Sequence, residues 1–145
     1  MSSRVHYTIL FVDDTPELLR AVSFALERLG GYTVITAPDG IRGLEQVSAI
    51  RPDCVVIDVK MPGLNGYQLT RALRGDPDTA DIPLIILSAL VQPDDQKEGM
   101  DAGVDYYLTK PLDPYKLVQA IHYAIQQSEE DRIGRMRELF GELDG

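Results

Sequence analysis

The chain has 145 residues, the size of one domain with a short appendage and enough to bury a full hydrophobic core. Lys and Arg number 14 against 23 Asp and Glu, and the resulting net charge of −9 argues against non-specific binding to nucleic acid or to an anionic membrane. The single cysteine, Cys54, cannot form an internal disulfide, no apolar run approaches the roughly 20 residues of a membrane span, and the N-terminus lacks the apolar core of a signal peptide. These features predict a cytoplasmic protein.

Five short apolar segments alternate with five segments of helical pattern. The expected strands cover residues 7–12, 32–36, 54–57, 83–87 and 105–109. The expected helices cover 16–30, 40–50, 66–75, 93–102 and the residues from 114 onward. Their starts carry capping signals, which are Thr15 before Pro16, Asn65, and Asp113 before Pro114.

This alternation predicts an α/β fold, a doubly wound five-stranded parallel sheet with helices on both faces. The segment 54–57 is apolar throughout, as expected for a central strand that is buried on both sides. The carboxyl ends of parallel strands lie at one edge of the sheet, and ligand sites form at that edge.

Polar side chains stand where the predicted strands end. They are three acids, a hydroxyl and an ammonium group: Asp13, Asp14, Asp58, Ser88 and Lys110. Clustered carboxylates repel one another, and a hard divalent cation such as Mg²⁺ relieves that repulsion. With no Cys or His in the set, Zn²⁺ is not expected. A cation site with a lysine and a hydroxyl suits a phosphoryl group, which a carboxylate can accept as an aspartyl-phosphate.

Each of these residues also has a structural interpretation. Taken alone, Asp13-Asp14 reads as the capping and first-turn acids of a helix, Asp58 as part of a Pro-Gly turn and Lys110 as a solvated charge. The functional interpretation depends on finding all of them in order. Tyr106 and Tyr115 are interpreted as packing residues.

Four separated segments strongly resemble the receiver domain of two-component response regulators. They are Ile9-Leu10-Phe11-Val12-Asp13-Asp14, Asp58 to Gly66, Ser88-Ala89, and Tyr107 to Pro111. The resemblance covers roughly residues 6–127. It implies a flavodoxin-like sheet of order 2-1-3-4-5 and a phosphoryl group that passes to Asp58 from a phosphohistidine of a histidine kinase or a histidine phosphotransfer protein.

The resemblance further assigns roles to single residues. Asp14 and Asp58 would ligate Mg²⁺ directly, with Mn²⁺ as an alternative ion, Asp13 would act through water, and the backbone carbonyl of Lys60 would be a further ligand. Lys110, Ser88 and the neighbouring Ala89 would bind the phosphoryl oxygens. Ser88 and Tyr107 would form the switch, with Tyr107 turning inward as Ser88 moves, and the Lys110-Pro111 peptide bond would be cis.

The chain continues past the expected end of a receiver domain. We expect residues 1–127 to form that domain and 128–145 a helical extension, in which Ile133, Met136, Phe140 and Leu143 recur at coiled-coil spacing. Two alternatives stay open, a tail that folds back or frays, and a signalling helix that pairs two chains or leads into an output domain. A homodimer could use this helix or the face of the fourth helix and fifth strand. Neither nucleic acid nor a membrane is an expected partner.

The predicted function is that of a phosphoacceptor, which promotes its own phosphorylation and dephosphorylation and is not an enzyme. Two other classes of function compete with this prediction. A phosphohydrolase of the haloacid dehalogenase type would need an acid two residues after the nucleophile, where this chain has Lys60. A docking module that is never phosphorylated would not need the acid cluster.

Overall fold

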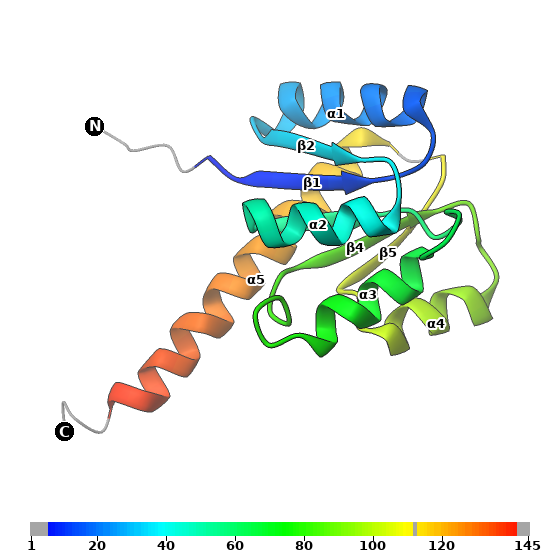
Figure 1. The fold of residues 1–145 in the computed structure, drawn as a ribbon. Helices are drawn as coiled ribbons and strands as arrows, with labels where there is room; N and C mark the ends of the chain where they lie inside the picture. Colours follow the sequence, from blue (N-terminus) through cyan, green and yellow to red (C-terminus); the bar gives the residue numbers. More distant parts are fainter. Residues whose placement is uncertain (1–5, 112, 142–145) are drawn as a thin grey trace.

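The computed structural model describes residues 6–111 and 113–141. Five strands and five helices alternate along the chain (Figure 1). The strands are β1 (Thr8–Val12), β2 (Thr33–Ala37), β3 (Cys54–Ile57), β4 (Leu84–Ser88) and β5 (Tyr106–Thr109). The helices are α1 (Pro16–Gly30), α2 (Gly40–Ile50), α3 (Gly66–Gly75), α4 (Pro93–Ala102) and α5 (Pro114–Phe140). All expected elements are present, with small shifts at their ends.

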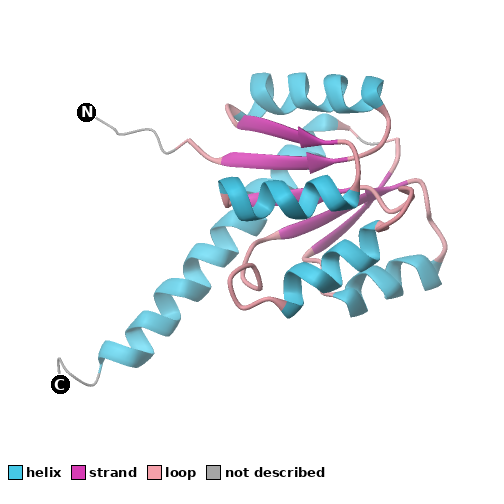
Figure 2. Ribbon diagram, in the orientation of Figure 1, coloured by secondary structure: helices cyan, strands magenta, loops and turns pink. Residues whose placement is uncertain are grey.

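The strands form one parallel sheet of order β2-β1-β3-β4-β5, which confirms the predicted doubly wound topology. In the register, Val12 at the end of β1 lies between Ala37 of β2 and Ile57 of β3. Figure 2 shows the strands running in one direction through the middle of the molecule. The residues that follow β1 and β3 therefore meet at one edge of the sheet.

Helices cover both faces of the sheet and enclose two apolar cores. On one face α1 and α5 pack against side chains that include Ile9, Phe11, Val56 and Ile85. On the other face α2 and α3 pack against the alternating set, including Leu10, Val12, Val55 and Ile57, and α4 lies beside α3 (Figure 1). Successive strand residues point to opposite faces, so a continuous apolar strand feeds both cores.

Capping interactions begin two helices as the sequence predicts. The Asn65 side chain accepts a hydrogen bond from the backbone N–H of Gln68, and Asp113 accepts one from Tyr115. Thr15 occupies the N-cap position of α1 as predicted, with Pro16 after it, but its side chain makes no capping hydrogen bond. Instead the Asp13 carboxylate accepts a hydrogen bond of 2.8 Å from the backbone N–H of Thr15 and orders the turn before α1.

Helix α5 runs without a break from Pro114 to Phe140 and projects past the sheet (Figure 1). It therefore does not fold back within the described residues. Its first half packs in the core, but Tyr115, which we interpreted as a packing residue, is 65% exposed. Three members of the predicted seam, Ile133, Met136 and Phe140, are about half exposed, and the fourth, Leu143, lies outside the described residues.

Polar contacts hold the middle of α5 to the body of the domain. The Tyr7 hydroxyl donates to the Glu129 carboxylate at 2.9 Å, the Ser128 hydroxyl donates to the Asp81 carbonyl at 3.4 Å, and Arg135 pairs with the Asp81 carboxylate at 3.5 Å. These contacts orient the exposed end of α5 relative to the sheet. Among the described residues, no helix combines the length and the apolar character that crossing a membrane requires.

Candidate functional site

Two adjacent acids follow strand β1, and they differ in their surroundings. The backbone N–H of Asp13 donates to the Ala37 carbonyl at 3.1 Å, which extends the β1–β2 ladder by one residue. The Asp13 side chain is buried at the sheet edge, while Asp14 is exposed. The strand end thus presents one fixed inner carboxylate and one outer carboxylate to the same place.

Asp58 directly follows the central strand β3. Its backbone N–H donates to the Val12 carbonyl at 2.9 Å, and its residue exposure is only 6%. The first residue of α3, Gly66, packs on the backbone of Asp58 and Val59, so that an added Cβ would lie 2.8 Å from the Val59 Cα. Strand β3 and helix α3 together fix the direction of the Asp58 carboxylate.

The three acids form one cluster, and Lys110 lies against it. One carboxylate oxygen from each of Asp13, Asp14 and Asp58 lies within 4.8 Å of the other two. The Lys110 ammonium nitrogen is 3.1 Å from Asp13 Oδ2 and 3.3 Å from Asp58 Oδ1. The backbone N–H of Lys110 donates to the Ser88 carbonyl at 2.8 Å, and the Lys110–Pro111 peptide bond is cis.

The site does not favour the ionised form of Asp58. Burial and the nearby Asp13 carboxylate raise the pKa of Asp58, while Lys110 acts in the opposite direction. Three carboxylates and one ammonium group leave a formal charge of −2 when all four are ionised. A bound dication would offset that charge.

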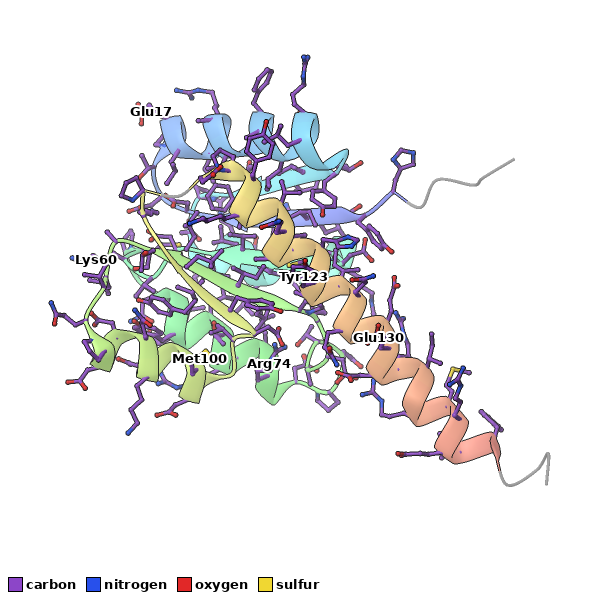
Figure 3. All side chains as sticks on the ribbon, turned by 180° about the vertical axis from the view of Figure 1, so that it is seen from behind. Glu17, Lys60, Arg74, Met100, Tyr123 and Glu130 are labelled. Atoms are coloured by element: carbon purple, nitrogen blue, oxygen red, sulfur yellow. The ribbon has the colours of Figure 1, made fainter. Side chains whose placement is uncertain are left out.

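The donors present suit a hard cation. The cluster offers only carboxylate oxygens, the ligand type that Mg²⁺ and Ca²⁺ take. Among the described residues, no histidine or cysteine belongs to this group. Few carboxylates at an open edge fit an ion that keeps several waters, as Mg²⁺ does. Lys60 is exposed and lies at the same end of the sheet (Figure 3).

The hydroxyl and the aromatic residue of the predicted switch lie on the neighbouring strands. Ser88, at the end of β4, is buried, and its Oγ accepts a hydrogen bond from the Leu90 backbone N–H at 3.0 Å. Ala89 is exposed beside it. Tyr107 in β5 is partly buried, and its hydroxyl donates to the Leu90 carbonyl at 2.9 Å. Both side chains thus contact the same peptide segment.

One residue near the site has no counterpart among the predicted ones. The Tyr67 hydroxyl in α3 is 3.3 Å from the Tyr107 hydroxyl and donates to the Asp95 carbonyl at the start of α4. Its place in the sequence, one residue after the Gly66 helix start, predicts only a buried aromatic of an amphipathic helix. No spacing rule connects residues 67 and 107, so only the packed structure brings them together.

Comparison with known proteins gives a consistent result. A family model described as the response regulator receiver domain matches residues 9–122. The DNA-binding dual master transcriptional regulator RpaA of Synechocystis is 37% identical over 121 residues, which cover 83% of this chain and 50% of RpaA. The chain thus spans about half the length of this relative.

Solved structures resemble the chain over most of its length. A response regulator from Chloroflexus aurantiacus matches with a TM-score of 0.80 and 32% identity, over 84% of this chain and 99% of that one. The receiver domain of sensor histidine kinase PA1611 from Pseudomonas aeruginosa, solved with a magnesium ion in its active site cleft, matches with a TM-score of 0.77 and 30% identity over 84% and 99%.

Proposed function

Because the chain belongs to the response regulator receiver domain family, we propose that Asp58 is its phosphoacceptor, loaded from a phosphohistidine on a histidine kinase or histidine phosphotransfer protein. The observation that carries the proposal is the position of the Lys110 ammonium group, in contact with both Asp13 and Asp58 within a cluster of three acids.

The transfer is a displacement at phosphorus. An Asp58 carboxylate oxygen forms the new O–P bond while the P–N bond to the donor imidazole breaks, and the imidazole leaves with the electron pair and takes up a proton. Burial limits the hydration of the Asp58 carboxylate, and the β3–α3 turn fixes its direction. Lys110 exchanges part of its contact with the carboxylates for a phosphoryl oxygen.

We assign the cation site to Asp14 and Asp58 as direct ligands, with Asp13 acting through water and the Lys60 backbone carbonyl as a further ligand. When bound, Mg²⁺, or Mn²⁺ in its place, supplies positive charge that offsets the charge of the carboxylates and of the phosphoryl oxygens. Asp13 also retains its hydrogen bond from Thr15 and its ion pair with Lys110, which hold its side chain in place.

Ser88 and Ala89 complete the proposed phosphoryl site. The Ser88 hydroxyl turns toward a phosphoryl oxygen and gives up its hydrogen bond from the Leu90 N–H, while the exposed Ala89 backbone leaves room for the group. The loop that follows β4 moves with Ser88, and Tyr107, bonded to the Leu90 carbonyl, responds to that movement.

We propose that residues 1–127 act as the receiver unit and that 128–145 form an interaction helix, which pairs with a second copy or leads into an output domain. The face of α4 and β5 is the second candidate for a homodimer contact.

The exchange with a histidine kinase places the chain in the cytoplasm, a compartment that the buried thiol of Cys54 suits. The net charge of −9 favours protein partners over DNA or an anionic membrane.

Incubation with acetyl phosphate and Mg²⁺, followed by intact mass, tests the proposal. We expect the wild-type chain to gain one phosphoryl group and Asp58→Asn to gain none. Omission of Mg²⁺ should slow the gain at least tenfold, and Lys110→Ala should slow it while leaving the chain folded. An equal gain in wild type and Asp58→Asn would exclude Asp58 as the acceptor, and steady multiple turnover of a small phosphate ester would favour a hydrolase.

A further inference from the structure

The hydroxyl groups of Tyr67 and Tyr107 form a partly buried pair between three elements. Tyr67 lies in α3 and is 5% exposed, and Tyr107 lies in β5. Their oxygen atoms are 3.3 Å apart, the Tyr107 oxygen is 2.9 Å from the Leu90 carbonyl, and the Tyr67 oxygen is 3.0 Å from the Asp95 carbonyl. The pair therefore joins the loop after β4 to the first turn of α4.

Two hydroxyl protons serve these three contacts. A phenol donates one proton, so at most two of the three contacts hold a hydrogen bond at any moment. If both hydroxyls donate to carbonyls, their oxygen atoms face each other without a proton between them. If Tyr67 donates to Tyr107 instead, the Asp95 carbonyl loses its hydrogen bond from Tyr67. A change at Leu90 therefore redistributes hydrogen bonds as far as α4.

The pair is connected to the phosphoacceptor site through one peptide segment. Ser88 Oγ accepts from the Leu90 N–H at 3.0 Å, and the Leu90 carbonyl accepts from Tyr107. If Ser88 turns away, the Leu90 segment is free to shift, and Tyr107 loses its first partner. Tyr67 then remains as the contact that keeps the Tyr107 hydroxyl inside the protein.

Helix α4 leaves a slot for the Tyr107 ring. Gly99 is buried, and an added Cβ would lie 2.6 Å from Tyr107 Cδ2 and 3.0 Å from Cε2. Real Cβ atoms essentially never show a contact of 2.6 Å, so a side chain at this position requires the ring or its surroundings to shift. Gly99 is therefore required for the inward position, although glycine in a helix lowers its stability.

We propose that Tyr67 is a positioning residue for Tyr107. The Tyr67 hydroxyl keeps the Tyr107 ring inward, in the slot beside Gly99, and thereby favours the phosphoryl-bound form of the site. This inference rests on the proposed function, in which Tyr107 lies inward when Ser88 binds the phosphoryl group. The buried environment of Tyr67 and its hydrogen bond to Tyr107 also raise the pKa of Tyr67, so that its hydroxyl keeps its proton at neutral pH.

The test is the affinity of each variant for beryllofluoride in the presence of Mg²⁺. Removal of one hydroxyl contact in Tyr67→Phe should weaken binding about twofold to tenfold, the range expected from one neutral hydrogen bond and a partial fall in the inward population. Gly99→Ala should weaken binding as well, by displacing the ring. The control Tyr123→Phe, which changes an exposed tyrosine of α5, should bind like the wild type.

Two further measurements separate positioning from general stability. In the protein labelled with fluorotyrosine, the ¹⁹F resonance of residue 107, assigned with Tyr107→Phe, should move toward its solvent-exposed position in Tyr67→Phe. The double variant Tyr67→Phe/Tyr107→Phe should bind no more weakly than Tyr107→Phe alone, because the pair is already broken.

Different failures have different meanings. Unchanged affinity and an unchanged Tyr107 resonance in Tyr67→Phe would overturn the positioning role, as would lower stability to urea without a change in affinity. If wild type and Asp58→Ala bound beryllofluoride equally, the proposed function would fall, and this inference with it.

Discussion

The Lys110 ammonium group lies between two carboxylates that are themselves close to a third. This arrangement balances the site only in part, since one positive charge faces three acids. The buried Asp58 carries the consequence, a raised pKa that Lys110 reduces without removing. The environment that makes the Asp58 carboxylate reactive therefore also lowers the stability of the folded protein.

The raised pKa of Asp58 predicts a pH dependence of stability. A carboxyl group whose pKa is higher in the folded state binds more protons when folded, so its ionisation lowers the free energy of unfolding as the pH rises from the unfolded pKa through the folded one. In EDTA at pH 7, we therefore expect Asp58→Asn to be more stable to urea than the wild type. The difference should vanish below about pH 4, where the carboxyl is protonated in both states.

Asp53→Asn is the matched control for this comparison. Asp53 is an exposed acid that precedes the same strand, and its side chain accepts a hydrogen bond from the Thr8 backbone N–H, which an asparagine oxygen can also accept. This variant should show no stabilisation at pH 7. An Asp58→Asn variant that is less stable than the wild type at pH 7 would mean that the ion pair with Lys110 outweighs burial and repulsion.

The start of helix α3 packs directly on the backbone of the site. Gly66 begins α3 and donates its backbone N–H to the Val59 carbonyl at 3.0 Å, and no side chain fits between them. The capping box of Asn65 and Gln68 closes the same end of the helix. The start of α3 thus fixes the turn after β3, and this turn fixes the position of Asp58.

Gly66→Ala should destabilise the domain by about 1–3 kcal/mol, because the added methyl group meets backbone atoms that cannot rotate away. The free energy of unfolding in urea measures this cost. Gly134→Ala in α5 is the matched control, since its Cβ meets no atom within 4 Å and alanine favours a helix. It should be neutral or slightly stabilising, and an equal loss in both variants would refute the close-approach explanation.

In the molecule as a whole, helix α5 presents exposed apolar side chains beyond the sheet. Its seam residues Ile133, Met136 and Phe140 are about half exposed, and Leu139 beside them is 72% exposed. With Ile133 and Phe140 at a positions and Met136 at d, Arg132 takes position g and Arg137 position e. A parallel pair of helices would place Arg132 of each chain opposite Arg137 of the other, which weakens self-association at low salt.

We predict that Arg137→Glu strengthens self-association several-fold, because each of the two like-charged pairs becomes an opposite-charged pair worth a few tenths of a kcal/mol. Sedimentation equilibrium at low salt measures the dimer constant. The wild-type chain should associate more as the salt concentration rises, since screening reduces the repulsion between arginines.

Arg20→Glu changes the net charge equally but lies exposed on α1, away from the seam. This control should associate like the wild type. If Arg137→Glu associated no more strongly than the wild type, α5 would not pair in parallel through this seam.

The order of the elements and their place in the sheet follow from local features of the amino-acid sequence. Apolar periodicity, Pro and Gly at helix ends, and polar residues after strands are local signals, and a parallel sheet converts strand ends into one shared edge. Asp13, Asp14, Asp58 and Lys110 could be grouped in this way before any coordinates, because topology alone brings them together. Cys54, in the apolar segment 54–57, could likewise be assigned to the interior, where it lies.

Contacts that depend on the direction of side chains from different elements could not be predicted in this way. Nothing in the spacing of Tyr67, Gly99 and Tyr107 indicates that they meet, because they come from two helices and a strand whose relative rotation is set by core packing. The same holds for the Asp13 contact with Thr15 and for the anchoring of α5 by Tyr7 and Asp81. The apolar pattern of the sequence indicates which face of a helix or strand is buried. The hydrogen-bond partner of a particular hydroxyl or carboxylate follows from the complete packing of the molecule.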